Sequence, residues 1–416
     1  MARVRTADLD VVVVRIGEPL LPFGVVADDC PLGAGTFGSY RLEVLAALAL
    51  AAPRFVDPPE RITGPALVLA DDTWVTRRAL RGFLRAAAPA SAPARLCLRR
   101  TPLLDMVLPL QDVALDEQRV AFGCAFVPAG HEMSAHEVLQ SPTWVAVDQR
   151  GFSVDVPVPR HILQRADGTI EWLLTSTFAM RIRHWLHVLR AAHVFPQIAL
   201  LESAVDDPIR TAWRLLAGLR PGPVARTEAW KRAFKWVGDR SFIHKSAVVE
   251  ASVIGDDVYV GPQAVILQSV IGDGCRIEQR AHVAQSTLGP KTFVSLNSSI
   301  SASVTFGDCD ACANNMQGCV VGPRAALTSF SRALDTIPGK QVRVDDRGTL
   351  REVGPLPCGV AFGPGVYAGA HITIAPGRAL PAGVRLSVPA DDVLRRVPRD
   401  LTPGDYTVID GMLRPR

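Results

Sequence analysis

A repeating interval of seventeen residues is the feature that most restricts how this chain of 416 residues can fold. The interval separates Ile243, Val260, Ile277 and Val294. Within each period, aliphatic side chains recur at steps of six, six and five residues. A glycine follows the third position of each set, at Ile254-Gly255, Ile271-Gly272, Leu288-Gly289 and Phe306-Gly307. The last interval is eighteen residues long, which we interpret as a slip of one residue. Repetition at a short fixed period is typical of a solenoid.

The interval predicts a three-sided coil, in which each side is a short strand with one aliphatic side chain pointing inward. Glycine, aspartate and asparagine at the corners tolerate the positive φ that tight turns need. Successive coils then stack at the parallel-strand spacing of about 4.8 Å. One coil cannot bury its inward residues, so several must stack to be stable. Alternating helices and strands, or an antiparallel sandwich, would not keep this spacing.

This pattern resembles the hexapeptide-repeat family, whose members fold as a left-handed parallel β-helix. The match runs from Ile243 to Phe306, and Val321-Gly322 and residues 359–377 resemble later coils. Residues 329–353 are polar and predict a loop or hairpin extruded from the coils. The resemblance supplies the left hand, and it implies a homotrimer packed along one face of the prism.

The first half of the chain has a different pattern, in which short apolar runs alternate with helical stretches. Leu9 to Val14 and Ala66 to Ala70 suit buried strands, and residues 40–52, 76–88 and 177–192 suit helices. Such alternation indicates an α/β domain. We therefore expect an α/β domain over 1–212, a helical linker over 213–240, a β-helix over 241–392 with an inserted loop over 329–353, and a tail over 393–416.

A glycine-rich segment in the first half is one candidate for chemistry. Gly33, Gly35 and Gly38, with Thr36 among them, form a G-x-G-x-x-G pattern before a predicted helix. Backbone N–H groups of such a loop at a helix N-terminus can hold a phosphate. An ordinary glycine-rich turn is the alternative, because residues 28–31 separate the motif from any strand.

Two adjacent carboxylates are the second candidate. Asp71 and Asp72 follow the apolar run Val68-Leu69-Ala70. Acidic residues at the carboxyl end of a strand in an α/β sheet are well placed to hold Mg²⁺ on a nucleotide phosphate. The alternative is that one of them caps the helix that begins near Thr76, or is solvated in the loop.

The segments from Leu69 to Leu80 and from Glu171 to Thr177 resemble the sugar-1-phosphate nucleotidyltransferases. The order of domains resembles the two-domain N-acetylglucosamine-1-phosphate uridyltransferase type. The resemblance implies that Gly33, Gly35, Thr36 and Gly38 bind a nucleotide or nucleotide sugar, and that Asp71 and Asp72 hold Mg²⁺.

The chain departs from that family at three places. Phe37 replaces the arginine of the family's Gly-Thr-Arg, no lysine precedes Lys231, and Leu174 or Thr175 replaces the second metal-binding aspartate. Arginine is not a simple substitute for a compact lysine charge. These departures indicate a degenerate domain that binds a sugar nucleotide or only supports packing.

A stretch in the second half resembles the acetyl-transfer site of bifunctional relatives, which transfer an acetyl group from coenzyme A. In Cys312-Ala313-Asn314, Asn314 matches the family's His-x-Asn segment and Cys312 replaces its histidine. The resemblance implies that Cys312 and Asn314 are catalytic, with acetyl-CoA or another acyl-CoA as donor. A neutral thiol is a poorer base at pH 7 than imidazole, which weakens this expectation.

Composition limits the remaining choices. The net charge is only +4, so nothing global indicates nucleic acid or an acidic membrane as a partner. We expect neither a secretory signal nor a membrane span. The eight cysteines are scattered along the chain, which is typical of reduced thiols. We therefore expect a cytoplasmic protein. The leading expectation is a transferase related to sugar nucleotides, nucleotidyltransferase-like and with acyl transfer as a second activity. The alternative is a non-catalytic trimeric scaffold or regulator.

Overall fold

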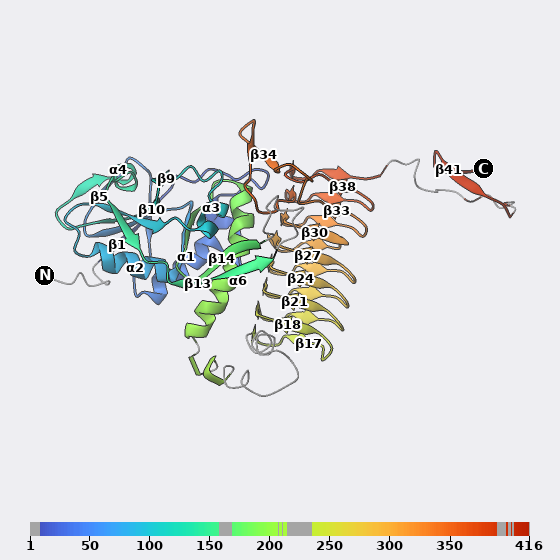
Figure 1. Ribbon diagram of the computed structural model, residues 1–416, viewed down its shortest axis with the longest axis horizontal. Coiled ribbons are helices and arrows are strands. Elements are labelled where there is room, and N and C mark those ends of the chain that lie inside the picture. Colours follow the sequence, from blue (N-terminus) through green and yellow to red (C-terminus); the bar gives the residue numbers. More distant parts are fainter. Residues whose placement is uncertain are drawn as a thin grey trace.

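The computed structural model describes residues 9–157, 169–206, 208–209, 211–213, 235–388, 397, 401 and 403–415. It has two main parts, a sheet-and-helix domain and a column of stacked coils beside it (Figure 1). The expected fold class, an α/β domain followed by a left-handed parallel β-helix, is confirmed. No helix among the described residues combines the length and apolar character needed to cross a membrane.

The N-terminal domain is built on one mixed sheet, with strand order β12-β8-β10-β6-β1-β4 and β9 beside β10. Its strands are β1 (Asp10–Val14), β4 (Arg54–Val56), β6 (Ala66–Ala70), β8 (Ala94–Arg99), β9 (Ala114–Leu115), β10 (Arg119–Val127) and β12 (Trp144–Val147). Only β10 runs antiparallel to its neighbours β6 and β8. The carboxyl ends of β1, β6, β8 and β12 therefore meet at one edge. The two apolar runs seen in the sequence form β1 and β6.

The helices agree with the sequence at two places and differ at a third. They are α1 (Phe37–Ala47), α2 (Arg77–Ala87), α3 (Pro102–Val107), α4 (Ala135–Leu139) and α6 (Trp185–Asp206), with a 3₁₀ turn at Ala27–Asp29. The expected helix over 177–192 is wrong at its start. Strand β15 (Ala179–Arg181) lies there, because these residues pair with β7 (Thr73–Val75). Most of the predicted linker helices lie outside the described residues, at 214–234.

The β-helix has three faces, each a parallel sheet. We call the first the α6 face; it comprises β16 (Lys235–Val237), β19 (Ser252–Ile254), β22 (Val270–Ile271), β25 (Thr287–Leu288), β28 (Val304–Thr305), β31 (Val320–Val321), β36 (Ala361–Phe362) and β39 (Ala379–Leu380). The second comprises β17 (Phe242–Ile243), β20 (Tyr259–Val260), β23 (Arg276–Ile277), β26 (Phe293–Val294), β29 (Asp310–Ala311), β32 (Ala326–Leu327), β37 (Tyr367–Ala368) and β40 (Arg385–Leu386). The third comprises β18 (Val248–Glu250), β21 (Val265–Leu267), β24 (His282–Ala284), β27 (Ser299–Ser301), β30 (Asn315–Gln317), β33 (Arg332–Ala333) and β38 (Thr373–Ile374). Strand β16 lies inside the expected linker, so the coils begin earlier than the sequence indicated.

The interval of eighteen residues at Phe306 is not a slip in the structure. Leu288 pairs with Thr305, seventeen residues later, and Thr305 is fully buried at the inward position. Its hydroxyl lies 2.8 Å from that of Thr292, so a polar pair replaces an aliphatic contact inside the column. Phe306 turns outward instead and stacks on Phe23 of the N-terminal domain, with ring centroids 4.6 Å apart.

A ladder of buried serines runs beside one corner of the column. Ser252, Ser269, Ser286 and Ser303 are each seventeen residues apart and fully buried. The backbone N–H of each of the last three donates to the hydroxyl of the serine one coil earlier, at 3.1–3.2 Å. Each hydroxyl also donates to a backbone carbonyl two residues before it. The ladder satisfies buried polar groups that would otherwise destabilise the coils.

Helix α6 joins the two parts of the molecule by packing on the α6 face (Figure 1). Outward valines of that face, Val270, Val304 and Val320, belong to the same buried cluster as the apolar residues of α6. An insertion between β33 and β36 carries the hairpin β34 (Arg343–Asp346)–β35 (Thr349–Glu352). It returns to α6, where Arg190 donates to the Pro357 carbonyl at 2.8 Å.

Five small antiparallel pairs complete the described structure. They are β2 (Pro31–Leu32) with β3 (Gly35–Thr36), β5 (Arg61–Thr63) with β11 (Glu132–Ser134), β7 with β15, β13 (Gly151–Pro157) with β14 (Thr169–Thr175), and β41 (Tyr406–Ile409) with β42 (Met412–Pro415). The β13–β14 hairpin lines a cavity with its apolar side chains. It lies beside α6 and, together with α6 and one corner of the column, lines this common cavity (Figure 1).

Candidate functional site

Asp71 and Asp72 follow β6 at the carboxyl edge of the sheet, as the sequence predicts, but both carboxylates are engaged. Asp71 Oδ1 accepts from the backbone N–H groups of Ile16 and Gly17, at 2.9 and 2.7 Å. Arg41, which also pairs with Asp28, donates to the Asp71 carbonyl at 2.9 Å. Asp71 therefore fixes the loop after β1.

Asp72 is closed off by an arginine. Its carboxylate is 2% exposed, and Arg181 Nε lies 2.7 Å from Oδ2. Burial raises the pKa of Asp72, and the neighbouring guanidinium opposes that shift. A Mg²⁺ ion at this place would have to displace a cation that already neutralises the carboxylate. The structure therefore does not support the expected Mg²⁺ site. No cluster of three metal-ligating side chains occurs elsewhere in the described ranges.

The glycine-rich segment folds as a tight hairpin rather than an open phosphate loop. Gly33 has a φ of 68°, and a Cβ there would lie 2.5 Å from the Phe195 ring of α6. Thr36 caps α1, because its hydroxyl accepts a hydrogen bond from the backbone N–H of Ser39. In return, the Ser39 hydroxyl accepts one from the backbone N–H of Thr36. The structure thus supports the ordinary-turn alternative for Gly33, Gly35, Thr36 and Gly38, since packing and capping account for this segment.

Cys312 and Asn314 lie close together on the column, where the second face turns into the third. Cys312 is half-buried, and burial raises the pKa of its thiol. The Asn314 side chain is exposed, and its Oδ1 accepts from the backbone N–H of Phe330 in the next coil. The Phe330 ring stacks on His371 at 5.2 Å. These contacts give Asn314 a structural role and leave the Cys312 thiol protonated near neutral pH.

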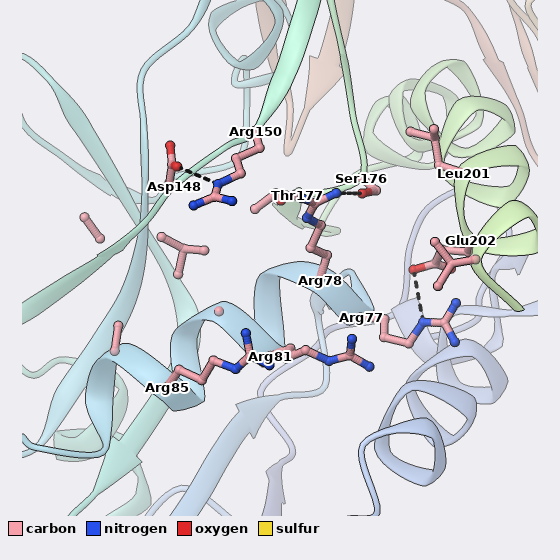
Figure 2. Close-up of a pocket in the computed structure, with 15 residues that line it drawn as sticks. Arg77, Arg78, Arg81, Arg85, Asp148, Arg150, Ser176, Thr177, Leu201 and Glu202 are labelled. Atoms are coloured by element: carbon pink, nitrogen blue, oxygen red, sulfur yellow. Dashed lines mark hydrogen bonds and ion pairs between the residues drawn. The ribbon is translucent and has the colours of Figure 1, made fainter. Parts of the chain in front are cut away.

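A cleft of about 580 Å³ opens beside α2, and arginines dominate its lining (Figure 2). Arg78, Arg81 and Arg85 leave one side of α2, and Arg150 enters from the opposite wall. Val147, the last residue of β12, lines the same cleft, which places it at the carboxyl edge of the sheet. Ligands of open α/β sheets bind in the crevice outside these strand ends.

The charges in this cleft are incompletely paired. Arg150 pairs with Asp148 at 3.2 Å, and Arg77 pairs with Asp206 at 2.7 Å. Arg78, Arg81 and Arg85 form no ion pair with any residue that the structure describes. Their spacing of three and four residues stacks like charges on one helix face, which destabilises a helix.

Helix α2 also begins with the wrong charge for its dipole. Arg77 and Arg78 occupy its first turn, and it contains no acidic residue. The positive end of a helix dipole favours anions and disfavours cations. A bound anion would relieve both this repulsion and the one between neighbouring guanidinium groups. The arrangement therefore lowers the stability of α2 and favours binding of an anion.

One buried hydroxyl at the cleft lacks a partner. Thr177 lines the cleft and is fully buried, and its Oγ1 has no hydrogen-bond partner within the described structure. Gln149, which does not line the cleft, donates through Nε2 to the Thr177 carbonyl at 3.4 Å. Unsatisfied buried polar atoms are rare and call for a ligand or a water. Thr177 therefore offers one hydroxyl beside the arginines.

The sequence search did not single out these arginines. The signal was present in Arg77-Arg78-Ala79-Leu80-Arg81-Gly82-Phe83-Leu84-Arg85, where arginines recur on one helix face without an intervening acid. Its first residues, Arg77 to Leu80, belong to the stretch from Leu69 to Leu80 that contains the Asp71-Asp72 motif. Arg150 could not be grouped with it, because sixty-five residues separate it from Arg85. Only the parallel pairing of β12 with β8 brings its loop to the same edge.

Comparisons with known proteins add little to the geometry. No model of a known protein family matches the sequence, and no protein of curated function matches it. One similar solved structure is described as a "putative acetyltransferase" from Bacillus cereus. It is 17% identical, with a TM-score of 0.17, and the match covers 35% of this chain and 79% of that protein.

Proposed function

We propose that the N-terminal domain binds a phosphorylated nucleotide ligand, a nucleotide or a nucleotide sugar, in the arginine cleft, and that it acts as a binding or regulatory domain rather than as a Mg²⁺-dependent nucleotidyltransferase. The observation that carries the proposal is that Arg78, Arg81 and Arg85, in one cleft, form no ion pair within the described part of the chain. Arg78 donates to the Ser176 hydroxyl at 3.4 Å. Guanidinium groups bind phosphate oxygens in a bidentate manner.

The size and the polar groups of the cleft support this ligand class. A volume of about 580 Å³ is within the range of small-molecule sites. The unpartnered hydroxyl of Thr177, which lines the cleft, suits a hydroxyl group of a ribose or a sugar. A ligand with both phosphates and hydroxyls would satisfy the arginines and this hydroxyl together. Inorganic phosphate would satisfy only the arginines.

The ion pair between Asp72 and Arg181 supports binding without nucleotidyl transfer. Metal-assisted transfer needs negative ligands that are free to hold the metal. Here the carboxylate that the sequence assigned to Mg²⁺ is buried against a guanidinium. The scaffold or regulatory alternative is thereby favoured over an active nucleotidyltransferase.

Ligand-induced stabilisation tests this proposal. UDP-glucose and UTP should raise the melting temperature of the wild-type chain, because a ligand that binds only the folded state at 100 times its Kd stabilises it by about 2.7 kcal/mol. The double variant Arg81→Ala/Arg85→Ala should lose the shift. Arg280→Ala/Arg324→Ala removes the same charge from exposed corners of the column and should keep it. Equal shifts in all three proteins would contradict the proposal.

We also propose that the chain self-associates as a trimer through the column. Helix α6 covers the α6 face, so the second and third faces are the surfaces available to another copy. Exposed Phe242 and half-buried Tyr259 stack on the second face at 5.6 Å, which places apolar surface there. Sedimentation equilibrium tests the proposal, and a monomer at micromolar concentration would contradict it.

Acyl transfer at Cys312 and Asn314 stays a prediction of the sequence, with acetyl-CoA or another acyl-CoA as donor. The protonated thiol and the engaged amide described above do not favour it. Its test is release of free CoA from acetyl-CoA in the presence of amino sugars, compared with Cys312→Ala and Asn314→Ala. Turnover that both variants abolish would establish the activity.

A further inference from the structure

A second cavity, of about 430 Å³, lies where three elements meet: the β13–β14 hairpin, helix α6 and one corner of the column. The hairpin alternates along β13, and along β14 except at Leu173, an apolar residue on the side away from the cavity. Val154, Val156, Ile170, Trp172 and Leu174 line the cavity, whereas Ser153 and Asp155 point the other way and are exposed. In the described sheets β13 and β14 pair only with each other, and the apolar side of this two-stranded sheet faces the cavity.

Hydrogen bonds between α6 and β14 fix the position of the hairpin beside the cavity. Gln197 of α6 accepts from Trp172 Nε1 at 2.9 Å and donates to the carbonyls of Leu173 and Thr175, at 3.3 and 3.4 Å. Leu356 and Pro357 of the insertion form part of the opposite wall. The cavity is therefore framed by side chains from both halves of the molecule, fixed by hydrogen bonds, and is not a loose gap under a hairpin.

The body of the cavity carries no charge. Among its described lining residues there is no lysine, arginine, aspartate or glutamate. His193 is the one titratable group among the lining residues that the structure describes, and its Nε2 lies 3.0 Å from the Ala302 carbonyl. Burial lowers the pKa of His193 to about 3, so the ring is neutral at physiological pH. A charged ligand body would lose its hydration here without gaining a counter-ion.

One end of the cavity is polar and regular. Gln268 and Gln285 occupy the same corner in successive coils, with φ values of 48° and 49°, and both side chains are exposed at the cavity. Coils stack at about 4.8 Å, so two carboxamides stand side by side at that spacing. Neither makes a side-chain hydrogen bond within the described part of the chain. Together they offer donors and acceptors to a carbonyl or amide.

We infer that this cavity binds an uncharged, mainly aliphatic molecule whose polar end carries an amide or ester carbonyl. The apolar hairpin side and the prolines enclose the chain of the ligand, and Gln268 and Gln285 hydrogen-bond its polar end. The inference does not depend on the arginine cleft, because the two cavities share no lining residue.

The test uses the full-length protein and the uncharged fluorescent probe N-phenyl-1-naphthylamine. The wild-type chain should bind the probe saturably, and octanamide should displace it at least five-fold more tightly than sodium octanoate, whose carboxylate finds no cation among the described lining residues. Val154→Trp fills the cavity and should weaken probe binding at least ten-fold. Ser153→Trp adds the same ring on the exposed side of the same strand and should leave binding unchanged.

A second variant keeps the test independent of hairpin folding. Gln268→Leu/Gln285→Leu changes only exposed corner side chains, so it should weaken octanamide at least five-fold while leaving the Kd of the probe within two-fold. Equal effects of the two tryptophan substitutions, or equal displacement by octanamide and octanoate, would overturn the inference. So would an unchanged octanamide Kd in the double glutamine variant. Thermal unfolding of each variant shows whether it is folded.

Discussion

Arg181 Nε lies 2.7 Å from Oδ2 of Asp72 and closes the carboxyl end of β6. The pair is asymmetric, because the Asp72 side chain is 2% exposed and that of Arg181 is 30% exposed. Arg181 reaches this position through β15, which pairs with β7 immediately after Asp72. The segment that the sequence assigned to a helix is thus the strand that neutralises the expected metal ligand.

Removing the Arg181 guanidinium should destabilise the folded protein, because the buried Asp72 carboxylate loses its counter-ion. Arg181→Met should lower the free energy of unfolding by about 3–5 kcal/mol at pH 8, because an unpaired buried charge remains. Without the guanidinium, the folded pKa of Asp72 rises further above its unfolded value. Stability is then lost as pH rises through the folded pKa, so the deficit should be smaller at pH 5. Urea denaturation at both pH values checks this, with the exposed Arg240→Met as control. A deficit that does not depend on pH would contradict it.

Acid should destabilise the contact between α6 and the column through His193. Its folded pKa of about 3 lies below the unfolded value of about 6.5, so the unfolded chain binds more protons between these values. Stability from this group is present above pH 6.5 and is lost as pH falls towards 3, by at most about 1.4 kcal/mol per pH unit. His193→Gln should reduce the slope of unfolding free energy between pH 6.5 and 4.5, measured in urea. His136→Gln, on an exposed position, should not.

The core of the column should be sensitive to truncation only at inward positions. Ile266 is fully buried in β21, and its neighbour Val265 points outward. Ile266→Ala should cost about 2–5 kcal/mol, because the coils above and below cannot collapse into the vacated space. Val265→Ala should cost much less. Guanidinium denaturation of both variants measures the difference, and equal costs would mean that the inward register is wrong.

The thiols should differ sharply in reactivity. Cys312 is half-buried, whereas the other seven cysteines are buried. Burial raises the pKa of Cys319 and Cys358 to about 12, so those thiols are both inaccessible and protonated. The native protein should show one fast thiol per chain with Ellman's reagent at pH 8, and Cys312→Ser should remove it. Two or more fast thiols in the native state would contradict this.

The column could be predicted from the sequence because its inward residues repeat at a fixed interval. Register errors arose where a polar residue took an inward place, as Thr305 did beside Thr292. The serine ladder was not predicted, because the repeat was traced through aliphatic residues and serine is polar. In the N-terminal domain, β1 and β6 were apparent as apolar runs. Strand β15 was not apparent in the sequence, because it is only three residues long and so short a segment shows no periodic pattern.

The sequence predicted the position of Asp71 and Asp72 after β6, but neither their partners nor the arginine cleft, which contains neither residue. The strand that ends at Asp71 does reach the expected edge of the sheet. What neutralises Asp72 is Arg181, which lies 109 residues further along the chain, and no local pattern could show that contact. The same holds for the cleft, whose Arg150 and Thr177 come from different loops. Hydrogen-bond partners that are far apart in sequence decide whether a carboxylate is free, and spacing alone does not contain that information.

Calorimetric titration of the full-length protein with UDP-glucose, in EDTA and again in MgCl₂, tests the central claim most directly. The account predicts saturable binding of similar affinity in both buffers, weakened at least ten-fold in Arg81→Ala/Arg85→Ala, because the arginines and not a metal hold the phosphates. Binding that appears only with Mg²⁺ and is unaffected by the two arginine substitutions would contradict it.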